Sequence, residues 1–172
     1  MKKVGVALSG GLDSTILAAL LSTHYEVIPY THVDEHVGDE TRVNAITDYL
    51  NIQRSNFIYA DKSVPTWVGY IASVRNEVEE LYYGDTLLIK VDNSTSTKRL
   101  AHDEVIEVSE NTICKFPFYK MTKAEVCYIG KIMIPNFNTL LDMTRSCTIP
   151  FGPVCNICFH CNERKWALEQ IS

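Results

Sequence analysis

The chain has 172 residues, of which 46% are hydrophobic and 22% are charged, and this balance excludes a disordered or collagen-like chain. Its 16 Lys and Arg against 21 Asp and Glu give a net charge of −5, which argues against a large duplex or tRNA footprint because phosphate neutralisation needs clustered cations. No apolar run approaches the ~18 residues of a membrane span, and the N-terminus lacks the long apolar core of a signal peptide. We therefore expect a cytoplasmic enzyme or binding module with one domain over residues 1–172.

The predicted elements alternate between short apolar strands and helices. Strands are expected at residues 4–8, 26–33, 57–60, 86–91 and 113–118, and helices through 16–21, from about 41 to 50, over 67–81 and over 122–131. Gly84 closes the apolar stripe of the third helix, and Thr122 with Glu125 forms a capping box at the start of the fourth. The segment Pro135–Pro153 carries few helix signals. This alternation predicts an α/β fold with an open, mostly parallel sheet and helices on both faces.

A glycine-containing loop follows the first predicted strand, at the position where ligands bind in open α/β sheets. Gly10 and Gly11 allow a tight bend and close approach to an anion, and the following helix offers free N–H groups. Asp13 can cap that helix or help to hold Mg²⁺. The loop has neither a Walker spacing nor GxGxxG, and a plain strand-to-helix turn is the alternative. The candidate nucleotide-binding residues are Leu8, Ser9, Gly10, Gly11, Leu12, Asp13, Ser14 and Thr15.

Four cysteines crowd into the end of the chain, at Cys147, Cys155, Cys158 and Cys161. Four thiolates are the ligand set of a closed tetrahedral zinc site, which leaves no open position for water and is therefore structural. An iron–sulfur cluster, a redox CxxC pair and buried free thiols are the alternatives. Cys114 and Cys127 fall on apolar strand and helix patterns and are expected to be small core residues.

The Ser9-Gly10-Gly11-Leu12-Asp13-Ser14 loop resembles the pyrophosphatase loop of the ATP pyrophosphatases, the PP-loop superfamily. The resemblance implies an adenine nucleotide alpha hydrolase-like, Rossmann-like fold. It also implies an enzyme that splits ATP into AMP and pyrophosphate through an adenylated intermediate. The motif is specific for the superfamily and carries no information on the substrate.

The C-terminal residues 144–168 resemble the signature of 7-cyano-7-deazaguanine synthase, with a Thr-x-Ser-Cys step, a CxxCxxC knuckle and a basic-aromatic helix. Residues 117–126 and the pair Arg75-Asn76 are similar to further segments of that family, and all these features occur in the family's order. This chain is shorter than the family between Val33 and Leu100, and it lacks a counterpart of a substrate-facing segment there.

The resemblance implies that 7-carboxy-7-deazaguanine, ammonia and ATP with Mg²⁺ react to 7-cyano-7-deazaguanine. It implies Lys123, Arg75 and Asp13 as catalytic residues, Asn76, Thr144 and Ser146 as substrate contacts, and a zinc-binding segment over 144–172. The partners are then small molecules, with no nucleic acid or membrane, and a homodimer is common in the superfamily. A ligase that stops at the amide or adenylates another acceptor, a sulfur-inserting tRNA enzyme and a non-catalytic nucleotide-binding module are the alternatives.

Overall fold

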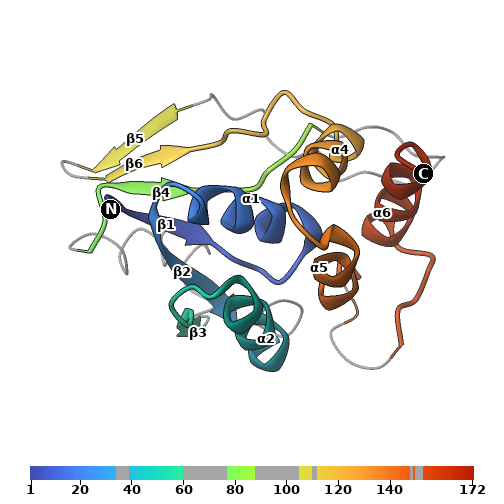
Figure 1. Cartoon of the computed structure of the whole chain (residues 1–172), viewed down its shortest axis with the longest axis horizontal. Coiled ribbons are helices and arrows are strands. Elements are labelled where there is room, and N and C mark those ends of the chain that lie inside the picture. The colour runs from blue at the N-terminus through green and yellow to red at the C-terminus, as the bar shows by residue number, and fades with distance from the viewer. Residues whose placement is uncertain (34–38, 60–76, 88–104, 110–111, 148, 150–152) are drawn as a thin grey trace.

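The computed structural model describes residues 1–33, 39–59, 77–87, 105–109, 112–147, 149 and 153–172. Within these residues the strands form one sheet in the order β3-β2-β1-β4-β6-β5 (Figure 1). β5 runs antiparallel to β6, and every other neighbouring pair is parallel. This confirms the predicted α/β class with a mostly parallel sheet. The strands are β1 (Lys3–Ala7), β2 (Glu26–Val33), β3 (Asn56–Tyr59), β4 (Glu80–Tyr82), β5 (Val105–Ser109) and β6 (Thr112–Lys115).

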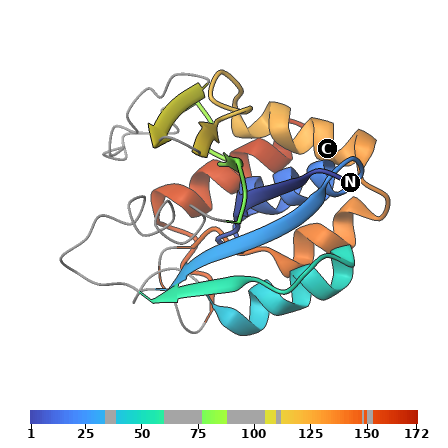
Figure 2. The ribbon, with the colours of Figure 1, turned by 90° about the vertical axis from the view of Figure 1, so that its left-hand side faces the viewer.

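Five helices lie in the described part of the chain, and all five bury side chains in one apolar cluster with β1. Their apolar spacing turns one face of each helix toward this cluster. Figure 2 shows the ribbon of these helices and of the sheet from a second side. A second cluster, on the opposite side of the sheet, contains Ile28, Tyr30 and Leu81. Among the described residues no helix is long and apolar enough to cross a bilayer. The helices are α1 (Leu12–Ser22), α2 (Glu40–Leu50), α4 (Lys123–Met133), α5 (Phe137–Met143) and α6 (Phe159–Glu169).

The capping box predicted before α4 is confirmed. Glu125 N donates to Thr122 Oγ1 at 3.2 Å, and Thr122 N donates to Glu125 Oε2 at 2.7 Å. The two bonds satisfy N–H groups that the first turn of a helix leaves without partners. Local sequence therefore determines where α4 begins.

The predicted helix over 67–81 is wrong at its C-terminal end, because Glu80–Tyr82 form β4 between β1 and β6. A strand of three residues is too short to show an alternating pattern, so the helical spacing dominated. Residues 67–76 lie outside the described part of the chain. Of the strand predicted at 86–91, Thr86 and Leu87 lie outside the named strands, and Leu87 makes only an isolated bridge with Thr122. β5 and α5 were not predicted.

The strand order reverses at β1, because β2 and β3 lie on one side of it and β4, β6 and β5 on the other. In open α/β sheets such a switch point opens a crevice at the carboxyl ends of the strands. Leu8, directly after β1, is fixed there by two bonds. Its N–H donates to Tyr30 O at 2.8 Å, and its carbonyl accepts from Thr31 Oγ1 at 2.6 Å. The glycine loop therefore begins from a fixed position at the ligand-binding edge of the sheet.

Candidate functional site

The residues between β1 and α1 form a compact loop whose shape depends on Gly10. Gly10 has a φ of +75°, in the left-handed region that favours glycine. The hydroxyl groups of Ser9 and Ser14 lie 3.0 Å apart, and Ser14 Oγ also accepts from Ser9 N at 3.2 Å. Gly11 N donates to Ser9 Oγ at 3.2 Å. These bonds hold the loop in one conformation before any ligand binds.

The first turn of α1 is available to an anion. Gly11 is the N-cap and supplies no side-chain bond to the helix, and the first N–H groups of an α-helix have no partner within it. Thr15 Oγ1 and Asp13 Oδ1 are buried and have no hydrogen-bond partner in the described part of the chain. Free backbone donors at the positive end of a helix are suited to a phosphate group. The predicted loop therefore has the geometry of a phosphate-binding turn.

Gly84, which follows β4, lies against the first turn of α1. A Cβ atom on Gly84 would lie 2.8 Å from Ser14 N and 2.9 Å from the carbonyl carbon of Asp13. Both atoms belong to the backbone of the first turn of α1, so a side chain at Gly84 would displace that turn. Gly84 was expected to end a helix. In the structure it instead lets the backbone after β4 approach the backbone of α1 closely.

Lys123 lies beneath the loop with its side chain only 3% exposed. Its ammonium group donates to Asp13 Oδ2 at 2.6 Å and forms an ion pair with Glu163 Oε2 at 2.9 Å. Burial alone would lower the pKa of Lys123, but attraction to the two carboxylates outweighs burial and raises that pKa above its ordinary value. Lys123 therefore stays charged and joins three helices, since Asp13 lies on α1, Lys123 on α4 and Glu163 on α6.

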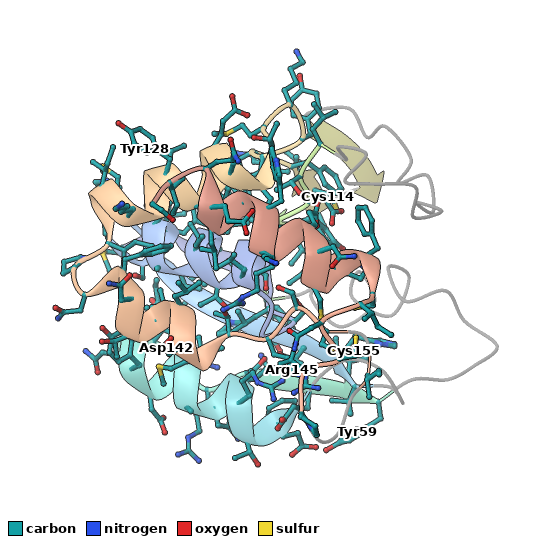
Figure 3. The ribbon with its side chains drawn as sticks, turned by 90° about the vertical axis from the view of Figure 1, so that its right-hand side faces the viewer. Tyr59, Cys114, Tyr128, Asp142, Arg145 and Cys155 are labelled. Carbon is teal, nitrogen blue, oxygen red and sulfur yellow. The ribbon has the colours of Figure 1, made fainter. Side chains whose placement is uncertain are left out.

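The C-terminal segment lies against the loop. Arg145 N donates to Gly10 O at 3.0 Å, and the Arg145 side chain, labelled with Cys155 in Figure 3, donates to Pro153 O at 3.4 Å. The buried Ser146 Oγ has no hydrogen-bond partner among the described residues. Residues 145–147 therefore connect the phosphate-binding turn to the cysteines. Thr144 is buried and its Oγ1 accepts from Arg164 Nη1 at 2.6 Å, so its hydroxyl oxygen already has a structural partner.

The four C-terminal cysteines converge, as their spacing predicted. All four Sγ atoms lie within 4.8 Å of one another, and the measured separations include 3.5 Å for Cys147–Cys155 and 3.4 Å for Cys158–Cys161. Four sulfurs at ~2.3 Å from a tetrahedral Zn²⁺ would be about 3.8 Å apart. Backbone N–H groups of Cys155 and Cys158 also point at the sulfurs of Cys147 and Cys155, at 3.5 and 3.4 Å. The donor set and its dimensions fit a tetrahedral metal ion.

The other two cysteines are core residues, as expected from their apolar surroundings. Cys114 and Cys127 are buried and free. Burial, followed by the nearby negative charge of Asp13, raises the pKa of Cys127 to about 12. Burial also raises the pKa of Cys114 above its ordinary value. Both thiols therefore stay protonated at neutral pH, which makes them unreactive.

The structure thus brings together the loop, Lys123, Thr144, Ser146 and the four cysteines. Arg75 and Asn76 lie outside the described residues, so their predicted roles stay predictions. Three charged residues near the loop were not predicted. They are Arg42 at the start of α2 and Glu163 and Arg164 on α6. Their positions depend on contacts across 20 or more residues of sequence, which no local pattern reports.

Arg42 lies beside Gly10 of the loop. Its Cδ lies 3.5 Å from the position that a Cβ would take on Gly10. Its guanidinium pairs with Asp39, the N-cap of α2, at 2.9 Å and is 25% exposed. A guanidinium placed beside phosphate-binding amides can bind phosphate oxygens in pairs.

Replacing Arg42 with alanine is expected to weaken the binding of ATP about tenfold, because one charge-assisted contact is worth about 1.5–3 kcal/mol. Isothermal titration with Mg·ATP measures this change. Arg54→Ala is the matched control, since Arg54 pairs with Asp48 at 3.1 Å beyond the opposite end of α2 and is 68% exposed. Equal ATP affinities for the two variants would contradict a role for Arg42 at the loop.

Comparisons with known proteins find similar sequences for the first part of the chain. Residues 1–64 match the family model described as asparagine synthase. The chain is 30% identical over 84 residues to a protein of Methanocaldococcus jannaschii that carries the provisional name asparagine synthetase (glutamine-hydrolysing) 1. This match covers 49% of the chain, which spans only 16% of the length of that relative. The segment matched by the family model contains the whole loop and ends before the four cysteines.

Among solved structures, the chain is similar to the phosphoadenylyl-sulfate reductase of Candida auris, crystallised as a phosphate complex. The TM-score is 0.47 and the sequence identity 15%, over 83% of this chain and 78% of that one.

Proposed function

We propose that this protein is an ATP-dependent carbon–nitrogen ligase that activates a carboxylate by adenylation and transfers the acyl group to ammonia. The observation that carries the proposal is the phosphate-binding turn at Ser9–Thr15, set at the switch point of the sheet above the buried Lys123–Asp13 pair. The asparagine synthase match over residues 1–64 supports the same class of reaction, since it contains that turn. Pyrophosphate as the bound group is what the resemblance of Ser9–Ser14 to the pyrophosphatase loop implies.

The roles of the residues follow from their positions. Backbone N–H groups of the turn would bind the pyrophosphate part of ATP, with Arg42 beside them. Asp13 Oδ1 is buried, has no partner within the described ranges of the chain, and would help to hold Mg²⁺, an ion that prefers carboxylate oxygens. Bound Mg²⁺ supplies charge that stabilises the leaving pyrophosphate. The ammonium group of Lys123 compensates the negative charge of Asp13.

The reaction has two balanced steps. A carboxylate oxygen of the substrate attacks the α-phosphorus of ATP, and the bond from that phosphorus to the bridging oxygen breaks, releasing pyrophosphate. Ammonia then attacks the carbonyl carbon of the acyl-adenylate, AMP leaves, and the nitrogen loses a proton to give the amide. The fixed loop and the helix dipole would lower the barrier by stabilising charge that develops on the phosphate oxygens.

We propose 7-carboxy-7-deazaguanine as the acid and 7-cyano-7-deazaguanine as the final product. A second ATP would adenylate the amide oxygen, and loss of AMP and of the two amide protons would form the nitrile. The resemblance of residues 144–168 supports this choice, and so does the placement of those residues. Arg145 N donates to Gly10 O, and the next residue, Ser146, has a buried Oγ without a partner in the part of the chain that the structure describes. Substrate contacts from Thr144, Ser146, Arg75 and Asn76 remain part of this proposal.

The four cysteines would hold a structural Zn²⁺. Four protein ligands fill a tetrahedral coordination sphere, so this metal would order the 144–172 segment rather than bind substrate. A colourless protein with one zinc ion per chain would support this assignment over an iron–sulfur cluster.

A second candidate is a ligase that stops at the amide or uses a different acid. The observation that favours it is the asparagine synthase match itself, since the name denotes formation of an amide. Both candidates share the adenylation step and the residues of the loop, and they differ in the acid and in the second use of ATP.

Mass spectrometry of an incubation with ATP, Mg²⁺, ammonium and 7-carboxy-7-deazaguanine tests the proposal. The expected products are the nitrile, AMP and pyrophosphate, and an incubation without the acid is the control. The amide alone would identify the second candidate. An unchanged acid, although ATP binds, would rule out this substrate and require another acid.

A further inference from the structure

Glu163 is a buried carboxylate on α6, the helix that starts within the cysteine cluster. It is 1% exposed and lies two residues after Cys161 on α6. Its ion pair is with Lys123 Nζ at 2.9 Å, on α4. A buried carboxylate is costly unless a cation compensates it, so the contact fixes α6 relative to α4.

The ammonium group that pairs with Glu163 also pairs with the phosphate-binding turn. Lys123 Nζ lies 2.6 Å from Asp13 Oδ2, in the first turn of α1. Two contacts therefore connect the helix of Cys161 to the loop. Arg164, the next residue, is close enough to Asp13 to interact electrostatically, and its guanidinium donates to Leu141 O at 2.8 Å. The four charges alternate in sign, lie on α1, α4 and α6, and are buried at Lys123 and Glu163 and half-buried at Asp13 and Arg164.

The beginning of α6 depends on the cysteines. Cys158 is its N-cap without a side-chain capping hydrogen bond, and Cys158 Sγ lies 3.4 Å from the Sγ of Cys161 in the first turn of the helix. A metal ion bound to both sulfurs would fix that turn, because metal binding orders the backbone that carries its ligands. Without the ion, the position of Glu163 would be held by packing, by its pair with Lys123 and by the bonds of the adjacent Arg164 to Thr144 and Leu141.

We infer that Glu163 is a positioning residue through which metal binding at the four cysteines and nucleotide binding at the Ser9–Thr15 turn strengthen each other. This inference rests on the proposed function, since it takes the turn as the nucleotide site. Coupling between the affinities at two sites is reciprocal, so a bound nucleotide must raise the affinity for the metal by the same factor by which the metal raises the affinity for the nucleotide. We expect this gain in affinity to slow the release of the metal.

The test measures how fast zinc leaves the intact zinc-loaded protein for a chromogenic chelator. The measurement is made with Mg²⁺ alone and with Mg²⁺ plus α,β-methylene-ATP, an analogue that cannot be split between the α- and β-phosphates. We expect the analogue to slow zinc release at least fivefold in the unaltered protein. Glu163→Gln should keep one zinc ion per chain, and the analogue should change the rate of zinc release from this variant less than twofold. In Glu163→Asp the analogue should slow zinc release in part, because the carboxylate is retained.

Glu169→Gln is the matched control on the same helix. The side chain of Glu169 is 59% exposed, and its ion pair with Lys165 is long, at 4.0 Å. Glu169→Gln should retain the full slowing. Titration calorimetry on the same samples measures whether the analogue binds. Binding without any slowing of zinc release in the unaltered protein would overturn the inference and leave the proposed function standing. Full slowing in Glu163→Gln would overturn the role of Glu163, and no binding to the unaltered protein would overturn both proposals.

Discussion

Replacing Lys123 with methionine is expected to lower the free energy of unfolding by about 3–5 kcal/mol, because breaking a buried ion pair leaves an uncompensated charge. Here two carboxylates, Asp13 and Glu163, would remain buried with like charges and without the cation that lies between them. Methionine has nearly the length of lysine, so the loss reports the charge more than the volume. The same change would move Asp13, and turnover of ATP should fall with stability.

Urea unfolding of the zinc-loaded protein, followed by circular dichroism, measures this loss. Lys165→Met is the control, since Lys165 lies on α6 with its side chain 78% exposed, and it should change stability by less than about 0.5 kcal/mol. Combining Lys123→Met with Glu163→Gln should cost less than the sum of the two single changes, because the residues share one contact. If Lys123→Met lowers the free energy of unfolding by less than about 1 kcal/mol, solvent screens the ion pairs of Lys123 with Asp13 and Glu163.

Replacing Gly84 with alanine is expected to weaken ATP binding about 10- to 100-fold. The added Cβ would lie 2.8 Å from Ser14 N, so the backbone of the phosphate-binding turn must move. Overpacking of this kind costs about 1–3 kcal/mol, and a tenfold change in affinity corresponds to about 1.4 kcal/mol. Because the affected atoms are backbone amides of the turn, nucleotide affinity should fall as well as stability.

Gly130→Ala is the matched control for Gly84→Ala. A Cβ on Gly130 would lie 2.7 Å from Phe137 Cε2, so this change also overpacks the core, but against a side chain on α5. Both variants should lose stability in thermal unfolding, whereas only Gly84→Ala should lose affinity for Mg·ATP. Equal losses of affinity would mean that general destabilisation, rather than displacement of the turn, weakens binding.

Local signals in the sequence were sufficient for the elements that position the loop. The apolar run before Ser9 forms β1, the glycines after it form the turn, and Thr122 with Glu125 begins α4. Each of these depends on residues close together in the chain. β4 was missed because its three residues owe their conformation to pairing with β1 and β6. α5 was missed because it is short and begins at Asn136 in the left-handed conformation, after Pro135, where the sequence favours a turn.

The candidate site shows the same division. The four cysteines were predicted because metal ligands must recur at short spacing, and their sulfurs do converge. Glu163 was not predicted, since a glutamate in a polar helix normally faces solvent, and its burial depends on Lys123, which is 40 residues earlier in the chain. Lys123 was expected as a catalytic residue, and the structure places its ammonium group 2.6 Å from Asp13 Oδ2.

Transfer of labelled oxygen tests most directly whether a carboxylate is adenylated at the Ser9–Thr15 turn. The protein is incubated with ATP, Mg²⁺, ammonium and 7-carboxy-7-deazaguanine whose carboxylate carries oxygen-18. Attack on the α-phosphorus predicts AMP with one oxygen-18 atom, because AMP leaves with the oxygen that bridged it to the acyl carbon. Formation of ADP and phosphate, or of AMP without label while the acid is consumed, would contradict adenylation at this site.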